Sequence, residues 1–178
     1  MTDQPSDVVQ WWREAEADWF SHDADFDRRF SERFMALHEA AARGELSSWA
    51  ETAEGSLALL ILLDQFPRNA FRGSARMYAT DPLARDIARR AEAAGHAAQV
   101  EARLRPFFFL PFTHSEDLAD HDLAVRLQTP QGGDALKFAK HHREIIQRFG
   151  RFPHRNALLG RPTTPDEQAF LDGGGFKG

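Results

Sequence analysis

The 178-residue sequence predicts an all-α fold. Apolar side chains recur at helical spacing along most of the chain, residues that start and stop helices flank these stripes, and no segment alternates as a half-buried strand does. This pattern predicts about seven to nine helices packed as antiparallel pairs. The hydrophobic share of 42% and the charged share of 28% fit one compact domain over residues 1–178, with flexible ends at 1–5 and 173–178.

Two amphipathic helices are predicted near the N-terminus. Ser6 is the expected N-cap of the first, whose apolar stripe is Val8, Trp12, Ala15 and Trp19. The second stops at Gly44, and its stripe is Phe26, Phe30, Phe34, Leu37 and Ala41. Both helices therefore bury aromatic side chains on one face.

The most apolar segment lies between Glu54 and Phe66. Leucine and isoleucine occupy nearly every face of it, which for a helix means burial among neighbouring helices. A buried strand would need a partner strand, and the sequence offers none. We therefore expect a central helix here, stopped by Pro67.

The middle of the chain predicts one regular helix and one short turn. Asp81 is the expected N-cap of a helix with Pro82 at its first position, and this helix runs to Gly95. Pro106 and Pro111 then bracket an aromatic segment that has room for no more than a turn or two.

Three further helices are predicted in the last third. Residues 113–116 have the spacing of a capping box and begin a helix towards Gln128. The next helix follows the turn at residues 132–133 and closes at Gly150, and its stripe is Phe138, His142, Ile145 and Phe149. A second capping box, at residues 164–167, begins the last helix.

The composition excludes several classes of protein. There is no cysteine, which removes disulfides, thiolate zinc sites and cysteine nucleophiles and favours a reducing compartment. The net charge of −5 argues against a general nucleic-acid or anionic-membrane surface. No signal peptide is recognisable, and the apolar run Leu57–Leu63 is too short to cross a bilayer. We expect a cytoplasmic protein that binds neither nucleic acid nor membrane.

Three long segments carry a family resemblance. They read LDQFPRNAFRG, FFFLPFTHSEDLAD and HHREIIQRFGRFPHRNALLGRPTTPDEQAFL. They resemble the signature blocks of the bacterial domain-of-unknown-function family 924, in order, between Trp11 and Leu171. The resemblance implies an all-helical, tetratricopeptide-like superhelix. It implies no activity and no set of catalytic residues, so the function has to be argued from the side chains.

The segment 148–161 is rich in positive charge and contains no acid. Guanidinium groups suit bidentate recognition of carboxylate or phosphate, so the segment predicts an anion site. The expected ligand-binding residues are Arg68, Arg148, Arg151, His154, Arg155, Asn156 and Arg161. Alternatively, these arginines pair with the protein's own carboxylates or cap helix C-termini.

A short echo joins this segment to the central helix. Residues 66–70 read Phe-Pro-Arg-Asn-Ala, and residues 152–157 read Phe-Pro-His-Arg-Asn-Ala. Each segment is expected to follow a helix end stopped by proline and to deliver an arginine and an asparagine. We expect the two segments to share a surface, which would bring Arg68 and Arg155 within side-chain reach.

Asp64 is placed at the expected end of the central helix, where the helix dipole disfavours an anion by about 0.3–1 kcal/mol. It should therefore have a cationic partner, either Arg68 four residues on or the loop that carries Arg151 and Arg155. Two roles are open. Asp64 is either one half of a buried ion pair that locks two loops, or an acid–base carboxylate tuned by the arginines.

The sequence predicts no metal and no cofactor. His114, Glu116, Asp117 and His121 are neighbours, but their spacing is no ligand motif, and Glu116 is assigned to the capping box. Nucleotide-binding glycine loops and serine-hydrolase elbows are absent. His142 lies on an apolar stripe and is expected to be a hydrogen-bonded core histidine.

Three functions remain open. The first is a binding module whose inner surface holds a small anionic molecule or a peptide carboxylate on the residues of the anion site. The second is a hydrolase or lyase for an anionic metabolite, with His154 as general acid/base and Asp64 or Glu116 as its partner. The third is a structural or interaction protein without a small ligand. Guanidinium groups that converge on an open pocket favour a ligand, whereas pairing with Asp or Glu favours the structural role.

Overall fold

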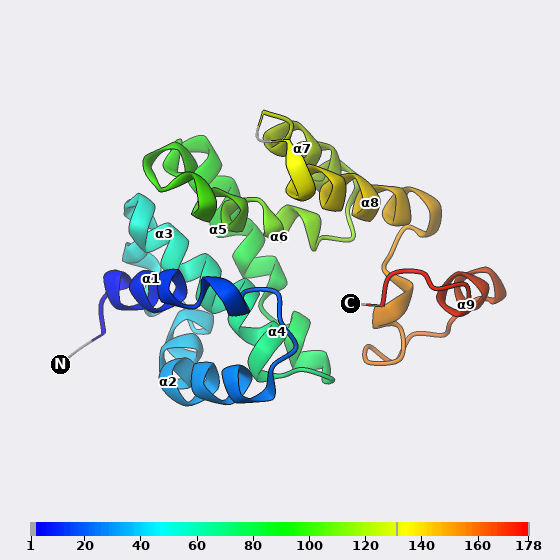
Figure 1. The fold of residues 1–178 in the computed structure, drawn as a ribbon, viewed down its shortest axis with the longest axis horizontal. Coiled ribbons are helices and arrows are strands. Elements are labelled where there is room, and N and C mark those ends of the chain that lie inside the picture. The colour runs from blue at the N-terminus through cyan, green and yellow to red at the C-terminus, as the bar shows by residue number, and fades with distance from the viewer. Residues whose placement is uncertain (1–2, 131, 178) are drawn as a thin grey trace. The chain divides into compact units, whose positions relative to one another are not determined.

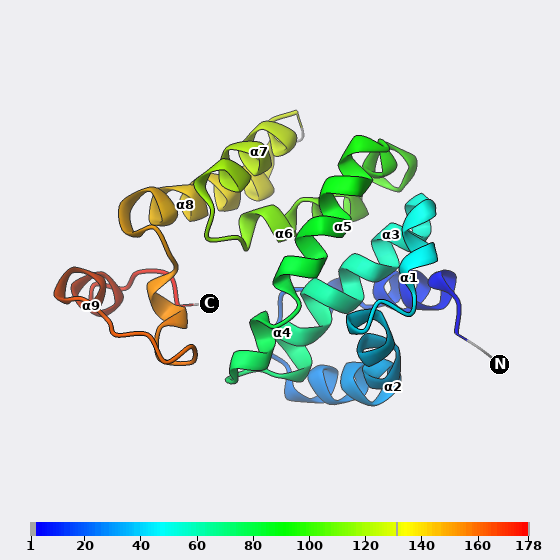
Figure 2. The ribbon, with the colours of Figure 1, turned by 180° about the vertical axis from the view of Figure 1, so that it is seen from behind.

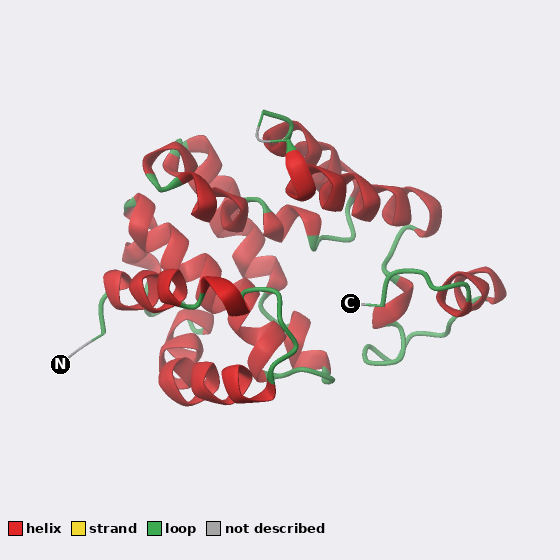
Figure 3. Ribbon diagram, viewed as in Figure 1, coloured by secondary structure: helices red, strands yellow, loops and turns green. Residues whose placement is uncertain are grey.

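The computed structural model describes residues 3–130 and 132–177, which form helices, turns and loops without a strand (Figure 3). These residues contain nine α-helices together with several short 3₁₀ segments. The all-α class and the expected number of helices are confirmed. The tetratricopeptide-like arrangement stays a prediction.

The chain divides into two compact units. Unit 1 comprises Met1–Arg72 and Arg76–Pro111, and unit 2 comprises Gly73–Ala75 and Phe112–Gly178. Each unit is described by itself below, and the expectation of a single domain stays a prediction.

Helix α1, Pro5–Glu14, begins and ends earlier than its apolar stripe predicts. Its N-cap is Gln4 rather than Ser6, because Pro5 takes a first-turn position that needs no N–H donor, and the Gln4 amide donates to the Asp7 carboxylate at 2.7 Å. The 3₁₀ turn Glu16–Asp18 follows α1.

The N-terminal aromatic side chains form the predicted core although Trp19 lies outside the helix. The Trp19 indole reaches back and donates to the Trp12 carbonyl at 2.7 Å. Helix α2, Ala24–Ala42, starts at its N-cap Asp23, whose carboxylate accepts from the Phe26 amide. The aromatic stripe of α2 is buried against Trp12.

A continuous helical run passes through the middle of unit 1 (Figures 1 and 2). It consists of α3, Ala53–Leu60, a π-helical turn, Ile61–Gln65, and α4, Phe66–Ala70. Residues 57–63 are buried, which confirms the predicted central helix. The expected stop at Pro67 is wrong, because Pro67 lies in the first turn of α4, where a missing N–H is tolerated.

Helices α1 and α5, Asp81–Ala93, pack against α3. Helix α5 has Thr80 as its N-cap, one residue before the predicted one. Gly55 permits a close approach inside unit 1, because a β-carbon there would lie 2.0 Å from the Trp49 carbonyl oxygen. The 3₁₀ segments between α2 and Pro111 are Ser47–Glu51, Ala75–Tyr78, His96–Gln99 and Ala102–Phe108, of which Ala75 belongs to unit 2.

Unit 2 is built on the pair of α7, Leu118–Gln128, and α8, Gly133–Phe149. The short helix α6, Leu110–Thr113, contains the boundary between the two units. The capping box predicted at residues 113–116 is wrong. The N-cap of α7 is Asp117, whose carboxylate accepts from the Ala119 amide at 2.9 Å.

The end of the chain follows the sequence signals closely. Helix α8 ends at Gly150, whose φ of 68° is the left-handed conformation that favours glycine. After the 3₁₀ turn Pro153–Arg155, helix α9, Pro165–Asp172, begins at Thr164 with the predicted capping box. Among the described residues, no helix is both long and apolar enough to cross a membrane.

The described parts of both termini contact the rest of the protein, and the expected flexible ends stay a prediction. The Asp3 carboxylate accepts two hydrogen bonds from Arg33, the shorter at 2.7 Å. The Phe176 ring packs on the cluster of Ile145, Ile146 and Phe152. Residues 1–2 and 178 lie outside the described residues.

We expect Leu60→Ala to lower the free energy of unfolding of unit 1 by about 2–5 kcal/mol, because Leu60 is fully buried in the central helix and its truncation leaves a cavity. Urea unfolding followed by tryptophan fluorescence measures this loss, because all four tryptophans lie in unit 1. Leu83→Ala, at a half-buried leucine of α5, should cost less. Equal losses in the two variants would contradict the central position of Leu60.

Candidate functional site

The arginine-rich segment connects α8 to α9 in unit 2. The left-handed Gly150 ends α8 abruptly, and Phe152, which is fully buried, anchors the following loop in the core. The loop is therefore fixed rather than a freely moving tail. The positions of its guanidinium groups can be given one by one.

Arg151 is committed to Glu167. The Arg151 Nε and Nη2 atoms donate to the two oxygens of the Glu167 carboxylate at 2.6 and 2.8 Å. Glu167 also accepts from the Thr164 amide at 2.8 Å, as the capping box requires, and from Asn156 at 3.2 Å. The hydrogen bonds from Arg151 outweigh burial, which alone would raise the pKa, and hold the Glu167 pKa at about 2.

Arg161 is committed to Glu116. Its Nη1 and Nη2 atoms donate to the Glu116 carboxylate at 2.6 and 2.9 Å, and the Phe152 amide donates to the same carboxylate at 2.7 Å. Burial alone would raise the Glu116 pKa, but these hydrogen bonds lower it. Glu116 thus ties the start of unit 2 to the arginine-rich segment, which explains why it does not serve a capping box.

Arg155 and Arg148 differ in their surroundings. Arg155 is buried, its Nη2 donates to the His114 carbonyl oxygen at 2.9 Å, and its guanidinium carbon lies 4.6 Å from the centre of the Phe152 ring. Arg148 is exposed and lies over the ring of Phe149, 4.6 Å from its centre. No hydrogen bond or ion pair joins Arg148 to another described residue.

Buried imidazoles lie beside the arginine-rich segment. His121 Nε2 donates to the Ser115 carbonyl oxygen at 2.7 Å, and its Nδ1 has no hydrogen-bond partner within the described part of the chain. His142 Nδ1 donates to the Phe138 carbonyl oxygen at 2.9 Å. Burial lowers the pKa of His121 and, aided by the charge of His114, that of His142 to about 2. Both rings are therefore neutral at physiological pH, and His142 is the hydrogen-bonded core histidine that its stripe predicts.

The Phe176 ring inserts into a set of aromatic rings on unit 2, which we call the ring cage. The distances from its centre to the ring centres of His142 and His154 are 4.4 and 5.1 Å. The corresponding distance to Phe138 and to His141 is 6.2 Å in both cases, and all four pairs meet edge to face. The ring cage consists of Phe138, His141, His142 and His154. Sequence reasoning missed it because nothing local indicates that Phe176 folds back onto α8.

Asp64 lies in unit 1, inside the helical run rather than at its end. Its carboxylate accepts from Gln65 at 2.6 Å and lies 3.3 Å from Arg68. Arg68 also donates to both oxygens of Asp81, at 2.9 and 3.1 Å. Burial alone would lower the Arg68 pKa, but Asp64 and Asp81 outweigh burial and raise it. Arg68 is thus the partner of Asp64, four residues on, and Asp81 is a second partner that the sequence did not reveal.

The π-helical turn around Asp64 has a local cause in Pro67. Proline has no N–H to return to the preceding turn, so the helix widens and backbone carbonyls become available to side chains. His38 Nδ1 donates to the Leu62 carbonyl oxygen at 2.8 Å, and the Thr80 hydroxyl donates to that of Leu63 at 2.6 Å. The turn is therefore held by side chains from neighbouring elements.

The structure places the predicted site residues in both units. Asp64 and Arg68 belong to unit 1, whereas the rest of the predicted anion site and Glu116 belong to unit 2. The shared surface of Arg68 and Arg155 spans the two units and stays a prediction. Within unit 2, the pairs formed by Arg151 and Arg161 favour the structural role for these two arginines. No group of three or more His, Asp or Glu residues that could hold a metal ion occurs among the described residues.

Comparisons with known proteins agree with this architecture. A family model described as "Bacterial protein of unknown function (DUF924)" matches residues 8–175. The solved structure of a protein of unknown function, ATU0120 from Agrobacterium tumefaciens, is similar over 95% of this chain and 97% of that chain, with 54% sequence identity and a TM-score of 0.93. A search of curated proteins finds no match.

Glu167→Gln tests the contribution of the Glu167 carboxylate, which accepts hydrogen bonds from Arg151, Asn156 and Thr164. The folded-state pKa of Glu167, about 2, lies below its unfolded value, so its carboxylate contributes stability above about pH 4.5 and loses it as the pH falls towards 2. We expect the substitution to cost on the order of 2 kcal/mol at pH 7 and clearly less at pH 3. Urea unfolding followed by far-UV circular dichroism measures both values. Asp166→Asn, at the exposed neighbour in the same turn, should change little at either pH. A Glu167→Gln penalty that does not depend on pH would contradict this assignment.

Asp64→Asn separates the two roles of Asp64. The carboxylate is 1% exposed, so its removal leaves Arg68 with an incomplete set of partners, and we expect a loss of about 3–5 kcal/mol at neutral pH. Asp81→Asn should cost less, because Asp81 is more exposed. Urea unfolding with tryptophan fluorescence compares the two variants. An unchanged midpoint for Asp64→Asn would make a structural role untenable and favour the acid–base role.

Proposed function

We propose that this chain, which belongs to the bacterial DUF924 family, is a binding module that receives a small anionic ligand or a peptide carboxylate bearing an aromatic ring on unit 2. The observation that carries the proposal is the position of Phe176 inside the ring cage. A phenyl ring of the protein's own tail occupies the place that the ligand ring would take.

The ring cage suits an aromatic guest. Aromatic pairs favour edge-to-face contact at centre-to-centre distances of about 4.5–7 Å, and the four contacts of Phe176 have this geometry. His142 is neutral at physiological pH, so it offers a polarised ring without a permanent charge. An apolar ring can therefore enter without desolvating a cation at this position.

Arg148 provides the preference for an anion. Its guanidinium lies over Phe149 and Phe170, and both of these rings pack on the same core cluster as Phe176. Because Arg148 is exposed and has no carboxylate partner among the described residues, its charge is available to a ligand that contacts this cluster. Arg151 and Arg161, which hold glutamates, build the loop instead.

The tail that carries Phe176 is suited to release. It is connected to α9 by the three glycines of residues 173–175, which have more freedom to lose on docking than other residues. Gly174 has a φ of 83°, and a β-carbon at Gly175 would lie 2.6 Å from the Phe170 ring. Both glycines are thus needed for the conformation of the docked tail. The contact of the tail with the ring cage is made by the Phe176 ring.

The other two functions stay predictions with weaker support. An enzyme needs His154 within hydrogen-bond reach of a free carboxylate, and Glu116 is already bound by Arg161. The two arginine–glutamate pairs favour a role as a structural or interaction protein. Absence of ligand binding in the titrations below would support this role.

The test uses 3-phenylpropionate, its neutral amide and 3-cyclohexylpropionate, titrated calorimetrically into the protein. We expect Phe176→Ala to bind the aromatic acid about 10- to 100-fold more tightly than the natural chain, because the competing ring is worth about 1.5–3 kcal/mol. Arg148→Gln should abolish the preference for the acid over the amide. The cyclohexyl analogue should bind more weakly than the aromatic acid.

Phe20→Ala is the matched control, since Phe20 is 72% exposed and lies in unit 1. Its affinity for the aromatic acid should equal that of the natural chain. Circular dichroism establishes that Phe176→Ala remains folded. A folded Phe176→Ala variant with no gain in affinity would refute the ring-cage site.

A further inference from the structure

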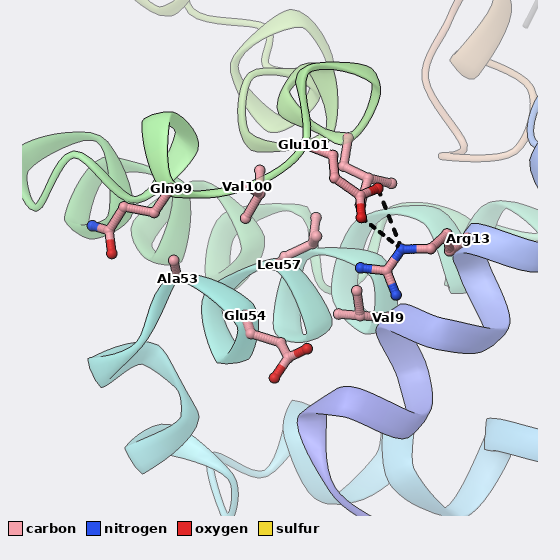
Figure 4. A pocket seen from close by; sticks show the side chains of 9 residues that line it. Val9, Arg13, Ala53, Glu54, Leu57, Gln99, Val100 and Glu101 are labelled. Carbon is pink, nitrogen blue, oxygen red and sulfur yellow. Dashed lines mark hydrogen bonds and ion pairs between the residues drawn. The ribbon is translucent and has the colours of Figure 1, made fainter.

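A pocket of ≈ 300 Å³ lies in unit 1, outside the site proposed above (Figure 4). Its residues come from α1, from the start of α3 and from the chain after α5. They are Val9, Arg13, Ala53, Glu54, Leu57, Gln99, Val100, Glu101 and Leu104. The volume is at the lower end of the range of small-molecule sites.

The pocket combines an apolar base with a charged rim. Val9, Leu57 and Leu104 are buried and form the base. Glu54 and Glu101 are exposed, and Figure 4 shows their carboxylates on different sides of the pocket. A guest therefore meets hydrocarbon below and carboxylate groups at the opening.

The two glutamates at the rim differ in their partners. Glu101 is held by Arg13, with 3.1 Å between Arg13 Nε and the nearer Glu101 oxygen, and it also accepts from Arg103 at 3.2 Å. Arg103 pairs with Glu16 as well. Glu54 forms no hydrogen bond or ion pair with any other described side chain. The rim thus retains one uncompensated negative charge.

Glu54 has a local reason to be acidic, because it lies in the first turn of α3, where the helix dipole favours an anion. That helix end is also satisfied without a ligand, since the Thr52 hydroxyl accepts from the Gly55 amide at 3.1 Å. Thr52 and Glu54 thus compensate the positive end of α3, so this helix end does not favour binding of an anion in the pocket. The helix dipole explains why Glu54 is acidic, but it does not explain why apolar side chains line the bottom of the pocket.

We propose that this pocket binds a small organic cation with a hydrocarbon body, the amine end paired with Glu54 and the body on Val9, Leu57 and Leu104. Charge complementarity selects the cation, and the apolar base selects the body. The proposal is independent of the site proposed on unit 2, where the ring cage would receive an aromatic ring and Arg148 an anion.

The experiment compares n-hexylamine, 1-hexanol and hexanoate, three ligands with the same hydrocarbon body and different head groups. Titration is followed by tryptophan fluorescence and calorimetry on the full chain. We expect hexylamine to bind at least tenfold more tightly than hexanol. Hexanol binding equal to that of hexylamine would refute a role for charge, and tighter binding of hexanoate would assign the site to Arg13.

Two variants locate the site. Glu54→Gln keeps the shape of the side chain. It should lower the affinity for hexylamine at least tenfold and leave the affinity for hexanol unchanged. Glu51→Gln, at an exposed glutamate that does not line the pocket, should leave both affinities unchanged. An unchanged hexylamine affinity in Glu54→Gln, or an equal loss in Glu51→Gln, overturns the proposal.

Discussion

In each of the two units a buried carboxylate is matched by a guanidinium group, and the surrounding structure depends on this pairing. An uncompensated buried charge costs more than a fold of marginal stability can tolerate. Asp64 lies against Arg68 in unit 1, and Glu167 holds Arg151 in unit 2. The Glu116–Arg161 pair, which is less buried, fixes the loop between α8 and α9 to the start of unit 2. This pairing favours a structural role for Arg68, Arg151 and Arg161, and their role in an anion site stays a prediction.

The groups that can act on a ligand are those that take no part in these ion pairs. In unit 2 these are the ring cage, which is aromatic, and the exposed Arg148, which is cationic. In unit 1 the pocket beside α3 has the opposite electrostatics, because Glu54 stands at its rim without a partner among the described residues. The acidic balance of the whole chain predicts neither arrangement, since local pairing decides which charges can act on a ligand.

Pro67 shows how one residue can shape a helix without ending it. Proline in a helix is usually expected to end it, and here it coincides with a π-helical turn that continues into α4. The carbonyl groups of this turn are satisfied by His38 and Thr80, which are remote in sequence. This arrangement places Asp64 inside the helical run, where Arg68 one turn later reaches both its carboxylate and its backbone carbonyl. The π-turn and the buried pair are thus one structural device.

The sequence by itself determined the helices, because helical periodicity and capping are local. The stripe of α2, the apolar segment 57–63, the glycine end of α8 and the capping box of α9 are all present as predicted. The local rules failed where a distant group competed: Glu116 binds Arg161 rather than capping a helix, and Phe176 docks on α8. Only the tertiary structure decided which arginines form ion pairs. Arg151 pairs with Glu167 and Arg161 with Glu116, and both partners are remote in the sequence, whereas Asp64 and Arg68 are neighbours on one helix. Pairing, burial and the pocket depend on those non-local distances, which no local pattern encodes.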